Sequence, residues 1–245
     1  MANEVSVKLS EQLDDKLLSV KAALPKDFNR ERFVQNCIAV MNSMPEMTQA
    51  NTGKVIQGLL KGAYLGLDFM NGECYLIKYK DSIQFQTDYK GEVKFTKKYS
   101  IRPIMDIYAK IVRDGDEFIE EIIDGQPRIN FRPKSFSKAP IIGAFAVVLY
   151  KDGGMEYETM STEDINGVRA NYSRASDSKA WKNSYDEMCK KTVLRRLCKH
   201  IETDFESVEA KKAWEEGSGM EFTKAPVSDP AEVIDVFPDA VSEVK

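Results

Sequence analysis

The sequence has few of the parts that most enzymatic sites need. His200 is the only histidine in 245 residues, so histidine metal clusters and Ser-His-Asp or Cys-His pairs lack their parts unless this residue serves every role. Neither a Gly-x-x-x-x-Gly-Lys-Ser/Thr phosphate loop nor a Gly-x-Gly-x-x-Gly motif occurs, so ATP and dinucleotide binding have no support. Carboxylates are abundant but have no diagnostic spacing, which leaves a metal-dependent nuclease as an alternative that the sequence does not favour.

Cysteine pairs and long apolar runs are also missing. The four cysteines contain no Cys-x-x-Cys spacing, so neither a zinc site nor a disulfide framework is indicated. The longest apolar run, Ile141 to Tyr150, contains Gly143 and is shorter than the roughly 20 residues of a membrane span. No apolar stretch of signal-peptide length stands at the N-terminus. We therefore expect a soluble cytosolic protein with reduced, buried thiols and no membrane contact.

The charge is divided unevenly along the chain. The formal net charge is −4, but residues 201–245 hold 12 acidic and 4 basic side chains, which leaves 31 basic and 27 acidic side chains in residues 1–200. Residues 206–245 are therefore predicted to be an acidic, mostly disordered tail and a possible partner-binding segment. Residues 1–205 are predicted to form the folded body of the protein, with residues 1–27 as an N-terminal helix.

The periodicity of apolar residues predicts an α+β fold that begins with three helices. The first is expected after Ser10, the second after Asn29, and the third after Thr52, with Gly66 as its left-handed C-terminal cap. A hairpin is expected around Lys80-Asp81-Ser82, followed by a helix over Lys90 to Tyr99.

The second half of the chain predicts antiparallel hairpins packed with helices. A strand over Ile101 to Val112 is expected to turn at Asp114-Gly115 into a second strand, which turns again at Asp124-Gly125. Another hairpin joins Ile141–Tyr150 to Met155–Met160, giving a β-meander core. One long helix is expected from Lys179 to about Ile201. Its apolar positions form one stripe, and Lys191, Arg195 and Lys199 form an adjacent, outward-facing stripe.

Basic blocks mixed with amides, hydroxyls and aromatic residues recur beside the predicted turns and polar loops. Such side chains hold phosphate oxygens in nucleic-acid complexes. The candidate DNA-binding residues are Gln84, Gln86, Thr87, Lys90, Lys94, Lys97, Arg128, Arg132, Lys134, Arg169, Asn171, Ser173, Arg174, Trp181, Lys190, Lys191, Arg195, Arg196 and Lys199. A solubilising surface explains any one block, and an accessory protein-interaction module with a basic body is a further alternative.

Several short motifs, in order along residues 24–205, resemble the phage RecT family of single-strand annealing recombinases. The most specific is the combination of Tyr89-Lys90-Gly91 with a later Lys-Lys-Thr-x-x-Arg-Arg helix behind a tryptophan. Where the family often has Ser-Pro-Trp, this chain reads Lys179-Ala180-Trp181. The other matching segments are Tyr75-Leu76-Ile77, Gln84-Phe85, Met160-Ser161, Ser178-Lys179-Ala180-Trp181 and Met188 to Leu197.

The resemblance implies an ATP-independent protein that binds single-stranded DNA, anneals it to a complementary strand and assembles into rings or filaments. It also implies a phage or prophage protein of the bacterial cytoplasm, with no catalytic site, no required cofactor and no metal. The implied partners are single-stranded DNA, annealed duplex, further copies of the chain, an exonuclease and, through the tail, a host single-stranded-DNA-binding protein. The implied core is a β-meander with helices. Residues 1–205 are then the DNA-binding, oligomerisation and annealing domain, with the helix of residues 1–27 as a subunit contact.

The residues themselves suggest how a strand is held. Lys191, Arg195, Arg196 and Lys199 are expected on one wall of a groove, with Gln86, Lys90 and Lys94 or Lys97 opposite. Arg128, Arg132 and Lys134 are expected in a lid, and Arg169, Asn171, Ser173 and Arg174 in a loop clamp. Trp181 either stacks on a base or packs in the core, and its place in the apolar stripe favours the core.

Overall fold

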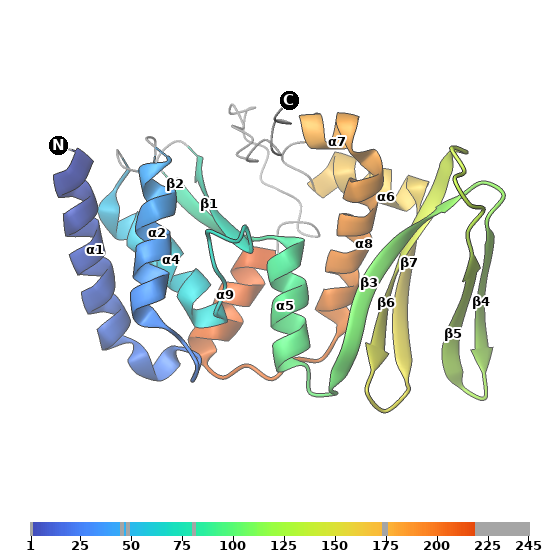
Figure 1. The fold of residues 1–245 in the computed structure, drawn as a ribbon, viewed down its shortest axis with the longest axis horizontal. Helices are drawn as coiled ribbons and strands as arrows, with labels where there is room; N and C mark the ends of the chain where they lie inside the picture. Colours follow the sequence, from blue (N-terminus) through green and yellow to red (C-terminus); the bar gives the residue numbers. More distant parts are fainter. Residues whose placement is uncertain (1, 45–46, 48–49, 80–81, 173–175, 219–245) are drawn as a thin grey trace, which may run out of the picture.

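The computed structural model describes residues 2–44, 47, 50–79, 82–172 and 176–218, and their elements form two halves with separate apolar cores. The helical half contains α1 (Ala2–Ser19), η1 (Lys21–Ala23), α2 (Arg30–Asn42), α4 (Thr52–Leu65), β1 (Cys74–Tyr79), β2 (Ser82–Thr87) and α9 (Val208–Ser218). The sheet half contains β3 (Ile104–Arg113), β4 (Glu117–Ile123), β5 (Gln126–Arg132), β6 (Ile141–Tyr150), β7 (Met155–Ser161), α6 (Thr162–Tyr172), α7 (Lys179–Asn183) and α8 (Tyr185–His200). Helix α5 (Tyr89–Tyr99) stands between the halves (Figure 1). The predicted α+β fold is confirmed.

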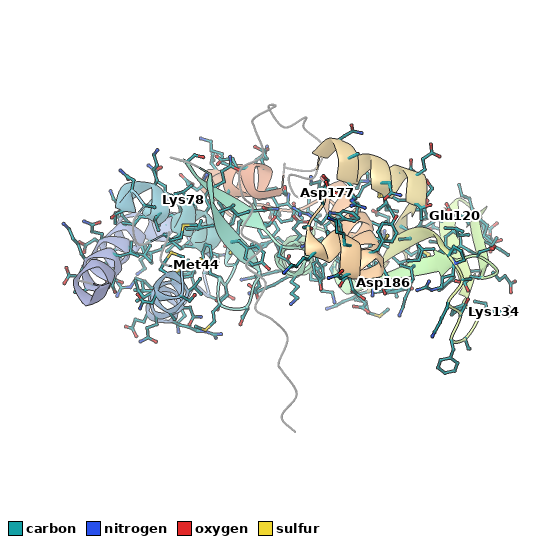
Figure 2. The ribbon with its side chains drawn as sticks, turned by 90° about the horizontal axis from the view of Figure 1, so that it is seen from above. Met44, Lys78, Glu120, Lys134, Asp177 and Asp186 are labelled. Atoms are coloured by element: carbon teal, nitrogen blue, oxygen red, sulfur yellow. The ribbon has the colours of Figure 1, made fainter. Side chains whose placement is uncertain are left out.

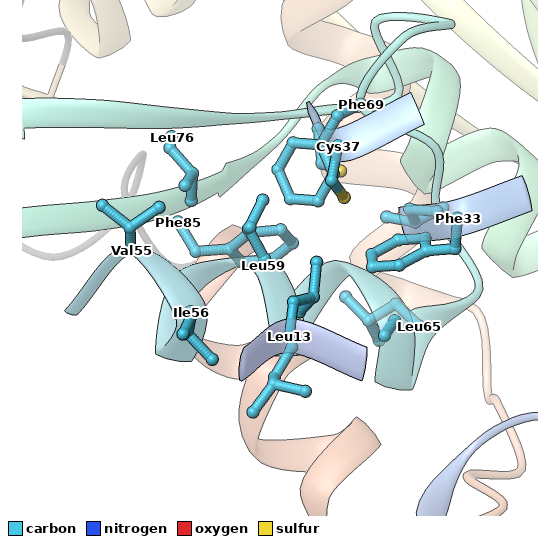
Figure 3. Close-up of a cluster of buried hydrophobic side chains, with 14 of the residues drawn as sticks. Leu13, Phe33, Cys37, Val55, Ile56, Leu59, Leu65, Phe69, Leu76 and Phe85 are labelled. Atoms are coloured by element: carbon cyan, nitrogen blue, oxygen red, sulfur yellow. The ribbon is translucent and has the colours of Figure 1, made fainter. Parts of the chain in front are cut away.

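The core of the helical half lies between its helices and the inner face of the β1–β2 hairpin. Leu13, Phe33 and Leu59, from three different helices, point into one cluster with Leu76 and Phe85 of the hairpin (Figure 3). Each such side chain contributes about 1.5–3 kcal/mol when it is removed from water. This burial fixes the hairpin on α4 and leaves its opposite face outside the core.

Asparagine side chains cap the starts of α2 and α4. The Asn29 side chain accepts a hydrogen bond from the Arg32 amide at 2.9 Å, as predicted, and Gly66 ends α4 with a φ of 64°. Two predicted starts were wrong. The cap of α4 is Asn51, which accepts from the Lys54 amide at 3.1 Å, and α1 already begins at Ala2. Ser10 therefore lies inside α1, whose Leu9 and Leu13 continue one buried stripe past it.

The sheet half has antiparallel strands in the order β3-β6-β7, covered by α6 and α8. The predicted β6–β7 hairpin is confirmed, but β3 does not turn into a hairpin with β4. Instead β3 pairs with β6, and β4 pairs only with β5. The hairpin β4–β5 is thus an insertion between two neighbouring strands. It packs on the sheet through rings, with the Phe118 and Phe145 centroids 5.1 Å apart.

The long C-terminal helix predicted over residues 179–201 is interrupted. Ser184 has φ −137° and ψ 47°, which separates α7 from α8. The break lets Trp181 reach the core of the sheet half from a different direction than α8.

The folded part extends further toward the C-terminus than predicted. Residues 208–218 form α9, and Trp214 stacks on Phe95 of α5 with ring centroids 4.6 Å apart. The predicted tail boundary at residue 206 was wrong because Ala210, Ala213 and Trp214 give α9 a buried face despite its acidic composition. Residues 219–245 lie outside the described residues.

Candidate nucleic-acid interface

The two segments expected on opposite walls of a groove touch each other directly. Helices α5 and α8 run side by side and in the same direction between the two halves (Figure 1). Lys191 Nζ lies 2.8 Å from Asp88 Oδ2, and Arg195 Nη2 lies 2.9 Å from Glu92 Oε1. The Thr87 hydroxyl donates to Glu92 Oε1 at 2.7 Å. We call Thr87, Asp88, Glu92, Lys191 and Arg195 the seam cluster.

Asp88 has two roles in this cluster. Its Oδ1 accepts a hydrogen bond from the Lys90 amide at 3.1 Å and so caps α5, while its Oδ2 binds Lys191. A carboxylate at a helix N-terminus is favoured by the free amides and the helix dipole. The same side chain therefore starts α5 and attaches it to α8.

Gly91 allows the backbone of α5 to approach the backbone at Glu73, just before β1. A Cβ built on Gly91 would lie 2.1 Å from the Glu73 carbonyl oxygen, which is too close for any other residue. Just before it, the Asp88 amide donates to the same Glu73 carbonyl at 2.9 Å. The glycine of the Tyr89-Lys90-Gly91 motif is thus required by packing.

Three of the predicted DNA-binding side chains point inward. Arg195 is 2% exposed and its partner Glu92 is 0% exposed, so the outward-facing position predicted for Arg195 was wrong. Thr87 is 1% exposed, and Trp181 is 5% exposed with the Arg169 guanidinium 5.2 Å over its ring. The core position favoured for Trp181 is confirmed. The four-residue spacing of Lys191, Arg195 and Lys199 gave no sign that Arg195 has a buried partner.

Other predicted cations lie at the surface in ion pairs with carboxylates. The pairs are Lys94 with Glu73 at 2.7 Å, Lys97 with Asp106 at 2.8 Å, Arg132 with Glu117 at 3.3 Å, Arg196 with Glu158 at 2.6 Å, and Lys190 with Glu187. The Lys97 ammonium holds the pKa of Asp106 below its usual value. The Lys97–Asp106 and Arg132–Glu117 pairs are exposed at both ends. Exposed pairs of this kind contribute about 0–1 kcal/mol, so a phosphate can replace the carboxylate in these two at little cost.

A second set of cations is exposed and carries no carboxylate partner among the described residues. Of the predicted residues, Lys90, Arg128 and Lys134 are in this set. Lys179 and Lys182 of α7 join it and were not among the predicted site residues. The signal in the sequence that could have identified these two lysines is the polar segment before Trp181. We call Lys90, Lys134 and Lys182 the edge lysines.

The remaining predicted residues fall into two places. Gln84 and Gln86 lie opposite Ile77 and Tyr75 on the face of the β1–β2 hairpin that points away from the core. Asn171 is exposed at the end of α6, where its amide donates to the Gly167 carbonyl at 2.9 Å. Lys199 is half-buried near the end of α8. Ser173 and Arg174, predicted in the loop clamp, lie outside the described residues.

Comparison with known proteins decides the family. The model of the RecT family matches residues 31–228. The chain belongs to the RecT family. Protein RecT of Escherichia coli (strain K12) is similar to it, with 29% identity over 195 residues that cover 76% of this chain and 71% of that protein. The RecT family comprises DNA-annealing proteins of homologous recombination that bind single-stranded DNA and associate with themselves.

The motifs that identify the RecT family are the ones that build the seam. Tyr89-Lys90-Gly91 supplies the tight start of α5, and the Lys190-to-Arg196 segment supplies the partners of Asp88 and Glu92. Lys191 also lies 5.6 Å over the Tyr89 ring. Much of what makes the RecT signature recognisable in this sequence therefore joins the two halves of the fold.

Across residues 2–218, apart from the gaps named above, no group of three or more histidine, cysteine, aspartate or glutamate residues is arranged to hold a metal ion. None of the helices in the described ranges is long and apolar enough to cross a membrane. His200, the lone histidine, lies with Nδ1 3.2 Å from Glu158.

Proposed function

We propose that this protein binds single-stranded DNA through its phosphate backbone and anneals it to a complementary strand without a nucleotide cofactor. Annealing needs the base edges of the bound strand to stay free, so the grip must be on phosphates and largely independent of sequence. Solvent-exposed lysine and arginine side chains meet this need, because they can bind phosphate oxygens and leave the base edges free.

The observation that carries the proposal is the position of the edge lysines. Lys90 stands in the first turn of α5, Lys182 in α7, and Lys134 after β5. Hairpin β1–β2, α7 and the start of α8 lie at one edge of the molecule, the upper edge of Figure 1, and α5 begins on the side that faces this edge. Viewed from that edge, Lys78 of β1 and Lys134 lie on different halves (Figure 2). A strand along this edge crosses both halves.

In this proposal the seam cluster positions the edge lysines. The buried Glu92–Arg195 pair fixes α5 against α8 and with them the spacing between Lys90 and the lysines of α7. The cations of exposed pairs, such as Lys97 and Arg132, extend the path when a phosphate displaces their carboxylates.

The direct test is an annealing assay with two complementary oligonucleotides and no nucleotide present. We expect faster pairing with the protein than without it, and equal pairing with or without added ATP. Lys90→Ala, Lys134→Ala and Lys182→Ala should each slow pairing, whereas Lys151→Ala in the β6–β7 turn removes the same single charge and serves as the control. Absence of any acceleration, or metal-dependent loss of the labelled DNA, contradicts the proposal.

Self-association is proposed to run through the acidic strand β4. Of the carboxylates of residues 114–124, Glu117, Glu120 and Glu121 lie on β4 and the other three flank it. Among the described strands β4 pairs on one side only, with β5. A head-to-tail contact between this strand and a basic surface of the next copy closes into a ring or continues as a filament. The N-terminal helix is a second proposed subunit contact, with Val7 and Leu18 exposed. Light scattering with and without DNA tests this, and a strict monomer in both states contradicts it.

The C-terminal segment is proposed to act on partners. Residues 219–245 are acidic, and we propose that they bind a partner exonuclease or a host single-stranded-DNA-binding protein in a bacterial cytoplasm. Because α9 belongs to the helical core, a truncation that tests this must end after Ser218. If the segment also competes with DNA for the lysines, residues 1–218 will bind DNA more tightly than the full chain. Equal or weaker binding contradicts competition.

A further inference from the structure

The loop between β5 and β6 carries an exposed aromatic ring in a strained turn. The Phe136 side chain is fully exposed, at 102%, and its φ is 57°. The Ser137 amide donates to the Lys134 carbonyl at 3.2 Å, so Phe136 occupies the third position of a four-residue turn. Glycine or asparagine is usual at this position because a side chain with positive φ is strained. A bulky residue held there without a packing partner calls for an explanation outside the fold.

The two ends of this loop are anchored, so the ring is presented from a fixed base. The Lys134 amide donates to Asp116 Oδ1 at 2.8 Å, and the Arg113 guanidinium donates to the Ala139 carbonyl at 2.8 Å. Hydrogen bonds from the Arg113 and Lys134 amides lower the pKa of Asp116, so this anchor stays ionised at neutral pH. The Asp114 amide also donates to the Pro140 carbonyl at 2.9 Å. Only the apex of the loop is left to project outward.

The surroundings of the ring select an anionic partner. Residues 126–140 contain four cations and no acid. Lys134 and Lys138 flank the apex, and neither ammonium has a carboxylate partner among the described residues. Lys134 lies at the end of the molecule far from Met44, beyond the sheet (Figure 2). An aromatic face between two free lysines fits a nucleotide, which offers a base to stack on and phosphates on either side.

We infer that Phe136 is a base-stacking residue that holds one nucleotide of single-stranded DNA, with Lys134 and Lys138 on the neighbouring phosphates. This inference rests on the proposed function and adds to it a contact with a base, whereas the edge lysines contact the backbone. Stacking is tolerant of sequence because every base has a π face, so it is compatible with annealing of any strand. It also fixes one end of the bound strand at the outer end of the sheet half.

The first test is a fluorescence titration of full-length Phe136→Trp with a deoxythymidine oligonucleotide. The native Trp181 and Trp214 are 5% and 8% exposed, so the new indole is distinguished by its emission at longer wavelength. We expect this emission to be quenched as DNA binds. Binding seen by anisotropy of a labelled oligonucleotide without any change in that emission overturns the inference.

The second test compares substitutions at this position. Phe136→Ala and Phe136→Leu should each weaken single-strand binding by roughly 5- to 150-fold, and Phe136→Tyr should keep it. The slope of affinity against salt should stay unchanged in all three, because a stacked ring neutralises no phosphate. Val208→Ala, which removes another exposed apolar side chain, is the matched control and should bind as the original chain does.

Folding and self-association are separated from stacking by two further outcomes. Phe136→Gly relieves the strain of the positive φ, so it should unfold at the same or higher temperature while losing affinity as Phe136→Ala does. If Phe136→Ala instead binds DNA normally, or if its main effect is to dissociate the protein in the absence of DNA, the inference is overturned. In those cases the original chain still binds single strands, whereas failure of the original chain to bind contradicts the proposed function itself.

Discussion

Cationic side chains have different roles in the seam cluster and among the edge lysines. In the seam, Lys191 and Arg195 face carboxylates of α5 at 2.8 and 2.9 Å, and Arg195 is wholly enclosed. At the edge, Lys90, Lys134 and Lys182 are exposed and meet no carboxylate among the described residues. A cation with a buried partner stabilises one arrangement of the fold, whereas a solvated one is available to a phosphate. Lys191 and Arg195, two cations of the most specific sequence motif, therefore stabilise the fold, and the exposed lysines are the ones available to DNA.

The largest expected effect comes from breaking the buried pair. Arg195→Met leaves Glu92 as a buried carboxylate without its guanidinium, which should lower the free energy of unfolding by about 3–5 kcal/mol. Denaturant unfolding measures this. Arg132→Met in β5 removes a pair with Glu117 that is exposed at both ends and should cost at most about 1 kcal/mol. An equal loss of unfolding free energy in the two variants would contradict a structural role for the buried Glu92–Arg195 pair.

The close approach of α5 to Glu73, just before β1, can be tested without changing charge. Gly91→Ala should lower the free energy of unfolding by about 1–3 kcal/mol or more, because its Cβ would meet the Glu73 carbonyl at 2.1 Å. Gly167→Ala in α6 is the matched control, since its Cβ meets nothing within 4 Å. It should stabilise the protein by about 0.5–1 kcal/mol. Thermal melts of both variants decide whether glycine is required at position 91, and equal stability of the two would contradict this.

The smallest effect on stability is expected at the edge. Lys182→Ala should change the free energy of unfolding by no more than about 0.5 kcal/mol, because no carboxylate among the described residues depends on it. It should nonetheless weaken binding to all single-stranded sequences by a similar factor. Fluorescence anisotropy with oligonucleotides of different sequence measures this. Selective loss on one sequence would mean that Lys182 reads a base.

Local patterns in the sequence predicted the elements well and their partners less well. Asn29 and Gly66 act through neighbours in the chain, so their roles were visible. The Asp114-Gly115 turn is present as well, with Gly115 at φ 83°. It does not lead β3 into a hairpin, because the preferred partner of β3 is β6, nearly thirty residues later in the chain. Strand pairing over such distances leaves no local signal.

The candidate site shows the same limit. The motifs around Tyr89 and Lys191 were identified, and the structure brings them together, but burial decided which cations face outward. Glu92 is one acid among many in the sequence. Only the packing of α5 on α8 shows that it forms a buried ion pair with Arg195. Helix α9 was missed for a related reason, since its acidic composition concealed the apolar face that Trp214 presents to Phe95.

The most direct test of the account is the salt dependence of single-strand binding in a variant that lacks the edge lysines. Each phosphate contact on a single strand contributes about −0.7 to the slope of log affinity against log salt. The original chain should show a steep slope, and the Lys90→Ala, Lys134→Ala, Lys182→Ala triple variant should lose about 2 units of it while remaining folded. The paired control Lys97→Ala, Arg196→Ala should lose less. An unchanged slope in the triple variant, or a larger loss in the control, would contradict the account.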